Sequence, residues 1–153
     1  MTSAGSTRIE FEGAQGELLA ARLDHAPGHP RAYALFAHCF TCSKDFVASS
    51  RLARGLASLG VSVLRFDFTG LGSSAGDFAN TTFSSNVEDL VRAADFLRRE
   101  HEAPALLVGH SLGGAAVLAA AGRIPEARAV ATIGAPADPG PGAKPLGDQR
   151  EEI

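Results

Sequence analysis

The sequence of 153 residues predicts an α/β fold with a mostly parallel sheet and helices on both faces. Short apolar runs of strand length alternate with segments of helical periodicity from about residue 31 onward. The run at 31–38 is almost continuously apolar, as expected for a strand covered on both faces. A hydrophobic content of 45% and a charged content of 20% are ordinary for a globular domain.

The expected element order is β-β-β-α-β-α-β-α-β, with right-handed crossovers between parallel strands. The first two strands flank the short segment Ala14-Gln15-Gly16 and are predicted to pair as an antiparallel hairpin. The predicted strands span residues 7–13, 17–24, 31–38, 61–68, 105–110 and 127–135.

Three predicted helices separate the later strands. The first follows residue 42, with Ser43 or Asp45 as its N-cap, and ends at Gly60. The second is expected behind a capping box formed by Ser85 and Glu88. Its buried face is predicted from apolar residues at helical spacing, namely Val87, Leu90, Val91, Ala94 and Leu97. The third follows the strand at 105–110.

Residues 1–135 are predicted to form one incomplete domain, and the Pro- and Gly-rich stretch at 136–153 is predicted to be a disordered tail. The formal net charge is -3 and the Lys and Arg residues are scattered, which argues against a nucleic-acid-binding surface. The N-terminus lacks the pattern of a secretory signal, and no segment is long and apolar enough to cross a membrane. We therefore expect a cytoplasmic protein without a membrane partner.

The motif Gly109-His110-Ser111-Leu112-Gly113, followed by Gly114, has the pattern Gly-x-Ser-x-Gly between a predicted strand and a predicted helix. In that context the pattern is typical of a nucleophile elbow, a strained turn that exposes the serine hydroxyl. Small residues are required because the strand and helix backbones nearly touch there. The alternative is a glycine-rich turn whose serine only caps the helix.

Two further segments agree with the elbow. "FAHCF" follows the third strand and "RFDFTGLGSS" ends the fourth. With these motifs the chain resembles the α/β-hydrolase superfamily over about residues 7–138. The longer stretch of sequence from "FAHCFTCSKD" to "IGAPADP" is similar to the hydrolase half of bacterial α/β-hydrolase/OsmC fusion proteins. The resemblance implies a partial α/β-hydrolase fold that lacks its C-terminal strands, and a serine hydrolase of the esterase type.

The resemblance also implies roles for individual residues. Ser111 would be the nucleophile, and the backbone N–H groups of Leu112 and Phe40 would form the oxyanion hole. His38 would brace the loop after the third strand, with a role as a weak base as the alternative. Asp67 and residues 70–74 would be structural parts of the loop beside the site. Cys39 stands where most of the superfamily has glycine.

A general base is missing from this pattern. In this fold the order along the chain is Ser, then Asp or Glu, then His. All the histidines precede Ser111; they are His25, His29, His38, His101 and His110. Asp138 is a candidate acid, but it has no histidine to orient. We therefore expect a shortened hydrolase domain with little or no triad-based activity alone, and an exposed sheet edge that favours self-association.

The sequence also agrees with three other functions. Cys39 and Cys42 lie after a strand and before a helix, as in thiol redox pairs. A non-catalytic binding protein on a hydrolase scaffold is a second alternative. A nucleotide-binding loop at residues 70–74 is a third alternative, although its sequence departs from the standard phosphate-binding loops. No cofactor or metal is expected, and the expected partner is a small-molecule, ester-like substrate.

Overall fold

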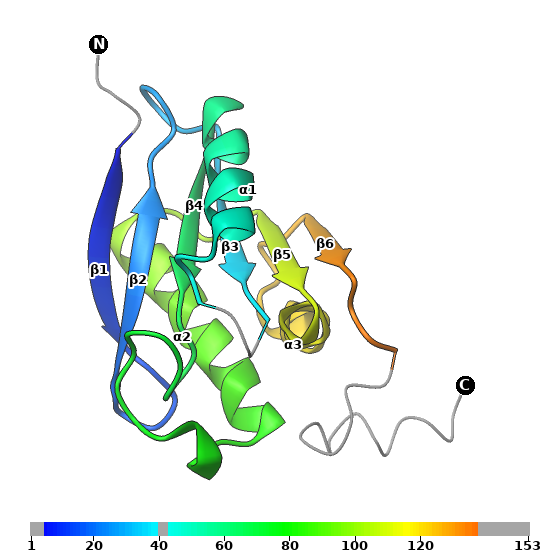
Figure 1. The fold of residues 1–153 in the computed structure, drawn as a ribbon. Helices are drawn as coiled ribbons and strands as arrows, with labels where there is room; N and C mark the ends of the chain where they lie inside the picture. The colour runs from blue at the N-terminus through cyan, green and yellow to red at the C-terminus, as the bar shows by residue number, and fades with distance from the viewer. Residues whose placement is uncertain (1–4, 40–42, 138–153) are drawn as a thin grey trace.

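A computed structural model describes residues 5–39 and 43–137 of the chain. A six-stranded sheet lies between helices on its two faces (Figure 1). The strands are β1 (Ser6–Glu12), β2 (Leu18–Asp24), β3 (Ala32–Ala37), β4 (Val61–Phe66), β5 (Leu106–His110) and β6 (Ala129–Ile133). The helices are α1 (Val47–Ser58), α2 (Phe83–Glu100) and α3 (Leu112–Ala120), with short 3-10 turns η1 (Phe78–Asn80) and η2 (Ala121–Arg123).

The strand order in the sheet is β1-β2-β4-β3-β5-β6. Strand β2 pairs antiparallel with both β1 and β4, whereas the pairs β3–β4, β3–β5 and β5–β6 are parallel. Helix α1 covers one face, and α2 and α3 cover the other (Figure 1). The predicted fold class and the N-terminal antiparallel hairpin are confirmed. The carboxyl ends of β3, β4 and β5 meet at one edge, where the candidate site lies.

Two apolar clusters stabilise these layers. The larger one fills the space between the sheet and helices α2 and α3, and includes the predicted stripe residues Leu90, Val91, Ala94 and Leu97. The smaller one lies between the sheet and α1. Its buried members are Ala34, Phe36, Ala53, Val63 and Val108.

The predicted start of α1 is wrong. The helix begins at Val47, and neither Ser43 nor Asp45 caps it, since its N-cap is Phe46 without a side-chain cap bond. The carboxylate of Asp45 instead pairs with Lys44 at 3.0 Å. Because Asp45 pairs with Lys44, it does not cap the helix, and α1 begins at Val47, later than the cap pattern predicts.

The predicted capping box of α2 is also wrong, and lies one turn too late. Thr82 accepts a hydrogen bond from the N–H of Ser85, and the hydroxyl of Ser85 accepts one from the N–H of Thr82. Helix α2 therefore starts at Phe83, whose ring is buried in the larger cluster. Glu88 forms an ion pair with Arg123 instead.

Strand β6 lies at an edge of the sheet, and all of its residues are exposed. The exposed fractions are 37% for Val130 and 45% for Ile133. Within residues 5–39 and 43–137, no helix is long and apolar enough to cross a membrane. Most of the predicted tail, residues 138–153, lies outside the described residues.

Candidate active site

Ser111 occupies the turn between β5 and α3. Its backbone angles are φ 57° and ψ -123°, and it is the only non-glycine residue with positive φ in the described part of the chain. Such a conformation is strained for a residue with a side chain and occurs mainly where function requires it. The side chain is partly exposed and makes no side-chain cap bond to α3. This geometry argues against a serine that only caps α3.

The glycines of the motif are required by space. A Cβ at Gly113 would meet the carbonyl oxygens of Ala37 and His38, and a Cβ at Gly109 would meet the backbone of Gly113. The backbones of strand β5, helix α3 and the end of β3 therefore lie in direct contact, with no side chain between them. This close approach places the carbonyls of Ala37 and His38 beside the first turn of α3.

Leu112 is the first residue of α3, so its N–H has no acceptor within the helix. A free N–H at a helix N-terminus is suited to stabilise negative charge. Phe40, the second predicted oxyanion donor, lies outside the described residues, as do Cys42 and Asp138.

The ring of His38 is fully buried. Its Nδ1 donates to the carbonyl of Cys39 at 2.5 Å. Its Nε2 lies 3.3 Å from Oδ1 of Asp67, although this contact is not aligned as a hydrogen bond. The ring edge also packs against Phe68, with 5.5 Å between ring centroids. Both ring nitrogens thus face atoms of the surrounding loops.

Asp67 connects several segments at this edge of the sheet. Its side chain is fully buried. Oδ1 accepts from the N–H of Lys44 at 2.6 Å, and Oδ2 accepts from the Lys44 ammonium and from the N–H of Ser73, both at 2.9 Å. Burial raises the pKa of this carboxyl, but the contacts with His38, Ser73 and Lys44 outweigh burial and hold the pKa well below its usual range. Asp67 is therefore an ionised carboxylate at neutral pH.

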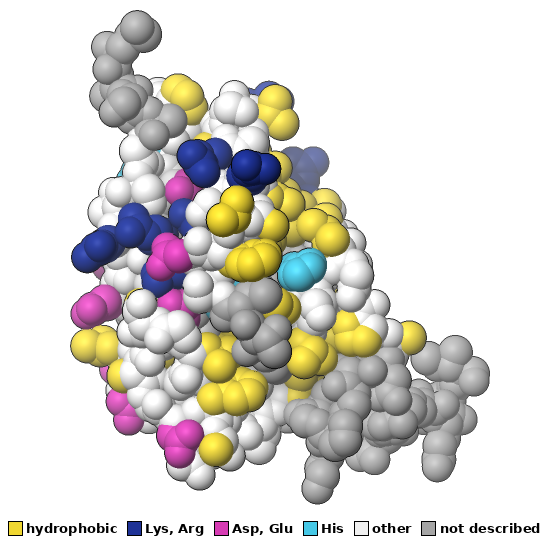
Figure 2. Space-filling view, viewed as in Figure 1, with side chains coloured by type: hydrophobic (Ala, Val, Ile, Leu, Met, Phe, Trp, Pro, Cys, Tyr) yellow, Lys and Arg dark blue, Asp and Glu magenta, His cyan; other side chains and the backbone are white. Residues whose placement is uncertain are grey.

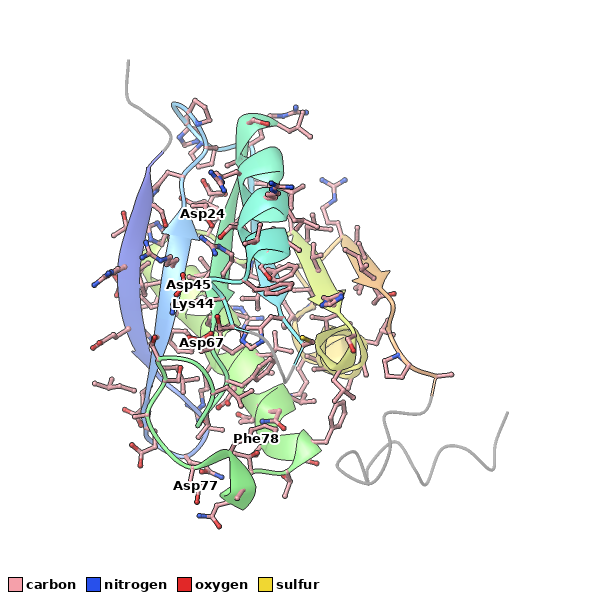
Figure 3. All side chains as sticks on the ribbon, viewed as in Figure 1. Asp24, Lys44, Asp45, Asp67, Asp77 and Phe78 are labelled. Atoms are coloured by element: carbon pink, nitrogen blue, oxygen red, sulfur yellow. The ribbon has the colours of Figure 1, made fainter. Side chains whose placement is uncertain are left out.

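Three buried charged residues on the side of the sheet that carries α1 were missed by the sequence analysis. Lys44 is 5% exposed, Arg65 is 4% exposed and Asp24 is 5% exposed. Arg65 forms two hydrogen bonds with Asp24, of 2.6 and 3.1 Å, and also donates to the carbonyl of Lys44. Figure 3 shows Asp24, Lys44, Asp45 and Asp67 along one side of the sheet, beside α1. The signal in the sequence was an arginine inside the apolar strand "VSVLRF", because a buried charge needs a partner.

Three other residues considered in the sequence analysis have partners of their own. His25 lies 2.6 Å from the hydroxyl of Thr7. His101 ends α2, and its ring packs on Tyr33 with 5.4 Å between centroids. Cys39 is disulfide-bonded.

Two cavities of the described residues lie away from Ser111. One of about 370 Å³ is lined by His25, Tyr33 and their neighbours. Another of about 250 Å³ lies beside Arg22 and Lys44. Neither is lined by Ser111. In the same residues no group of three or more His, Cys, Asp or Glu side chains could hold a metal ion.

The sequence profile of the Alpha/beta hydrolase family matches residues 34–152. The chain belongs to this family. Its strand order, elbow and mostly parallel sheet agree with that assignment. The narrower likeness to OsmC fusion proteins stays a prediction.

Solved structures similar to this chain include the esterase domain of a Rhodothermus marinus protein. It is 56% identical, with a TM-score of 0.72, and the match covers 88% of this chain and 52% of that one. An a/b serine hydrolase without a lid from Xanthomonas campestris is 26% identical, with a TM-score of 0.75, covering 90% of this chain and 64% of that one.

Curated relatives include the mitochondrial palmitoyl-protein thioesterase ABHD10 of Mus musculus. It is 42% identical over 77 residues, which are 50% of this chain and 25% of that protein. The human protein of the same name is 42% identical over 77 residues, covering 24% of its length. The chain thus spans about a quarter of these relatives and about half of the bacterial esterase domain.

Proposed function

We propose that the chain carries the nucleophile and part of the oxyanion hole of a serine hydrolase that acts on small acyl esters or thioesters. The strained backbone of Ser111, in a turn where only glycines fit beside it, is the observation that carries this proposal. The similar proteins named as an esterase and a thioesterase support an acyl substrate.

In this proposal a general base takes the proton of the Ser111 hydroxyl while its oxygen attacks the acyl carbonyl, and the base later returns that proton to the leaving alcohol or thiol. The carbonyl oxygen becomes negatively charged, and the N–H groups of Leu112 and Phe40 stabilise it. The alcohol or thiol leaves, and water then releases the acid from the acyl-enzyme. Loss of one oxyanion donor typically lowers kcat by about 10²–10³-fold, so the geometry of both N–H groups matters.

The general base that would take the proton of Ser111 is the missing part of this mechanism. No histidine follows Ser111 within these 153 residues, and the nitrogens of His38 face Cys39 and Asp67. This arrangement supports a bracing role for His38 rather than a role as base. We propose that the acid and the histidine come from polypeptide outside this stretch, and that residues 1–153 alone are weakly active or inactive.

A fluorophosphonate probe tests the proposal directly. The purified chain is incubated with the probe, and the mass of the whole chain and of its peptides is recorded. Labelling at Ser111 that Ser111→Ala abolishes, and that the exposed control Ser84→Ala retains, would support an activated serine. The absence of labelling in folded protein would mean that Ser111 is not activated within these residues, as expected of a hydrolase fragment whose base lies elsewhere or of a non-catalytic binding scaffold, and rapid stoichiometric labelling would refute the proposal that the base lies outside residues 1–153.

A thiol redox function is the second candidate, because Cys39 is disulfide-bonded in the structure. Counting free thiols after mild peroxide treatment of the reduced chain decides it. Loss of both thiols together, with recovery on reduction, supports a redox pair. Thiols that persist under these conditions argue against it.

We further propose that the chain self-associates through β6. Hydrophobic side chains gather over α1, β5 and β6 on the face seen in Figure 2, and Ile133 is among the exposed ones. An unpaired strand edge beside such a surface is a template for another strand. The cytoplasmic location expected from the N-terminus stays a prediction.

A further inference from the structure

A row of three arginines crosses strands β1, β2 and β4 on the face of the sheet that carries α1. Arg8 of β1 pairs in register with Arg22 of β2, and Arg22 pairs in register with Arg65 of β4. The Arg65 guanidinium reaches the hydroxyl of Ser50 in α1 at 3.0 Å, which identifies the face. Like charges directly opposite each other on neighbouring strands repel. Each arginine of this row therefore needs a negative partner close to it.

The negative partners become fewer along the row. Arg65 forms two hydrogen bonds with the buried Asp24, of 2.6 and 3.1 Å. Arg22 has one contact of 3.0 Å with Asp45, whose side chain is 50% exposed. Arg8 is exposed and forms no ion pair with any residue in the described ranges 5–39 and 43–137. The positive charge is therefore least compensated at the β1 end of the row.

The cavity of about 250 Å³ lies at this end of the row. Its lining includes three cations, one hydroxyl and two carboxylates, namely Arg8, Arg22, Lys44, Ser73, Glu10 and Asp45. Lys44 is only 5% exposed, so one of the cations is fixed in the wall, whereas both carboxylates are exposed and can turn toward water. Figure 2 shows basic and acidic side chains gathered over β1 and β2. A cavity of this volume suits a small ion or the charged head of a larger molecule.

Asp45 already binds two of these cations. Its Oδ1 lies 3.0 Å from Nε of Arg22, and its Oδ2 lies 3.0 Å from the Lys44 ammonium. Figure 3 shows Asp45 and Lys44 together between β2 and the start of α1. The two carboxylate oxygens thus take the positions that two oxygens of a bound anion would take. When Asp45 turns outward, Lys44 keeps Asp67 as a partner at 2.9 Å, so no buried charge is left unpaired.

We propose that this cavity binds a phosphate group, and that Asp45 competes with phosphate for Arg22 and Lys44. In the bound state Asp45 faces the solvent, Arg8 and Arg22 donate to phosphate oxygens, and the Lys44 ammonium adds positive charge from the wall. Guanidinium groups match the geometry of phosphate oxygens. Phosphate carries about two negative charges at neutral pH, so it can compensate both arginines, which one carboxylate cannot. The site does not include Ser111, and the proposal is independent of the proposed hydrolase function.

The test is a titration of the isotope-labelled chain with inorganic phosphate, followed by NMR. Ionic strength is held constant, because salt screens exposed charges. The amide signals of Arg22 and Ser73 report on the cavity. The variants are Arg22→Met, Arg8→Met and Asp45→Ala. Arg128→Met is the matched control, since Arg128 is exposed and precedes β6, at the opposite end of the sheet.

We expect saturable binding of phosphate with a Kd in the millimolar range. Arg22→Met should raise the Kd by about tenfold or more, because a charge-assisted pair of hydrogen bonds is lost. Arg8→Met should raise it by about threefold or more, and serves as the test should Arg22→Met fail to fold. Asp45→Ala should lower the Kd by about two- to fivefold, since an exposed ion pair no longer competes. Arg128→Met should leave it unchanged.

Two further ligands define the chemistry. Acetate should bind at least about tenfold more weakly than phosphate, because it carries half the charge. Phenyl phosphate separates the two sources of a phosphate group: tighter binding than inorganic phosphate supports a phosphate monoester as the ligand, and weaker binding supports the free ion.

Three results would overturn the inference. The first is a lack of saturable binding at millimolar phosphate. The second is equal binding of acetate and phosphate, which would mean that the cavity does not select phosphate. The third is an unchanged Kd in folded Arg22→Met and Arg8→Met, or in Asp45→Ala, since the ion would then bind elsewhere or without competition from Asp45.

Discussion

The backbone N–H of Ser111 donates a hydrogen bond of 2.8 Å to the carbonyl of Ile133, the last residue of β6. This bond joins the candidate nucleophile to a strand whose residues are all exposed and whose outer edge is unpaired within the described sheet. The elbow therefore takes part of its support from the least protected strand of the fold.

We expect the purified chain to self-associate through β6. Light scattering at increasing protein concentration should detect dimers or larger species, because an open strand edge pairs readily. Val130→Lys should lower the apparent mass by placing a charge on this strand. Leu59→Lys is the matched control, since Leu59 is 68% exposed at the end of α1, away from β6, and should have no effect. A wild-type monomer at all concentrations would contradict this prediction.

Gly113→Ala should destabilise the fold. A Cβ at this position would meet backbone carbonyls of Ala37 and His38 that cannot move aside, so a loss of about 1–3 kcal/mol in the free energy of unfolding is expected. Gly122→Ala should be near neutral, because nothing lies within 4 Å of the added carbon. Urea denaturation of both variants measures the difference, and equal stability would refute the close approach of β3 and α3.

The backbone strain at Ser111 is measurable with two substitutions that both remove the hydroxyl. Glycine tolerates φ 57° and ψ -123° without strain, whereas alanine does not. Ser111→Gly should therefore be more stable than Ser111→Ala by about 1 kcal/mol. The comparison uses chemical denaturation at neutral pH. An alanine variant as stable as the glycine variant would mean that the turn is not strained.

Asp67 should contribute stability that depends on pH. Its pKa is lower in the folded chain than its ordinary value of 3.8. Its contribution is therefore complete above about pH 4 and is lost as the pH falls toward the folded-state pKa. Asp67→Asn should cost about 3–5 kcal/mol at pH 7, because Lys44 keeps a buried charge. The difference between wild type and variant should shrink when denaturation is repeated at pH 3, and a constant difference would contradict the ionised pair.

Buried and exposed arginine pairs should differ in their effect on stability. Arg65→Met leaves the buried carboxylate of Asp24 unpaired and should cost about 3–5 kcal/mol. Arg98→Met removes a pair with Glu126 in which both side chains are partly exposed, and should cost less than about 1 kcal/mol. Thermal unfolding of the two variants side by side checks this, and similar losses would refute the distinction.

Local pattern was sufficient to predict most of the elements. Alternation of apolar runs predicted the strands, and Gly109, Ser111 and Gly113 predicted a tight turn between strand and helix, because steric demands at that turn leave few other sequences. The positions of the strands in the sheet, β1-β2-β4-β3-β5-β6, were not predicted, since periodicity says which residues are buried but not which strands are neighbours.

The charged groups around the site were not predicted beyond His38 and Asp67. Lys44 and Asp24 are far apart in the sequence, and only the fold brings them to Arg65 and Asp67. The N-terminus of α1 was misplaced for the same reason. Aspartate is a favoured N-cap residue. The carboxylate of Asp45 instead forms ion pairs with Lys44 and Arg22.

The two apolar clusters differ in size, and this has a consequence for how the molecule opens. Helix α3 packs on the larger cluster, whereas α1 packs on the smaller one. Regions with fewer buried contacts open locally at lower free energy. We therefore expect α1 to open at a lower free energy than α3, so that the two helices nearest the candidate site differ in persistence.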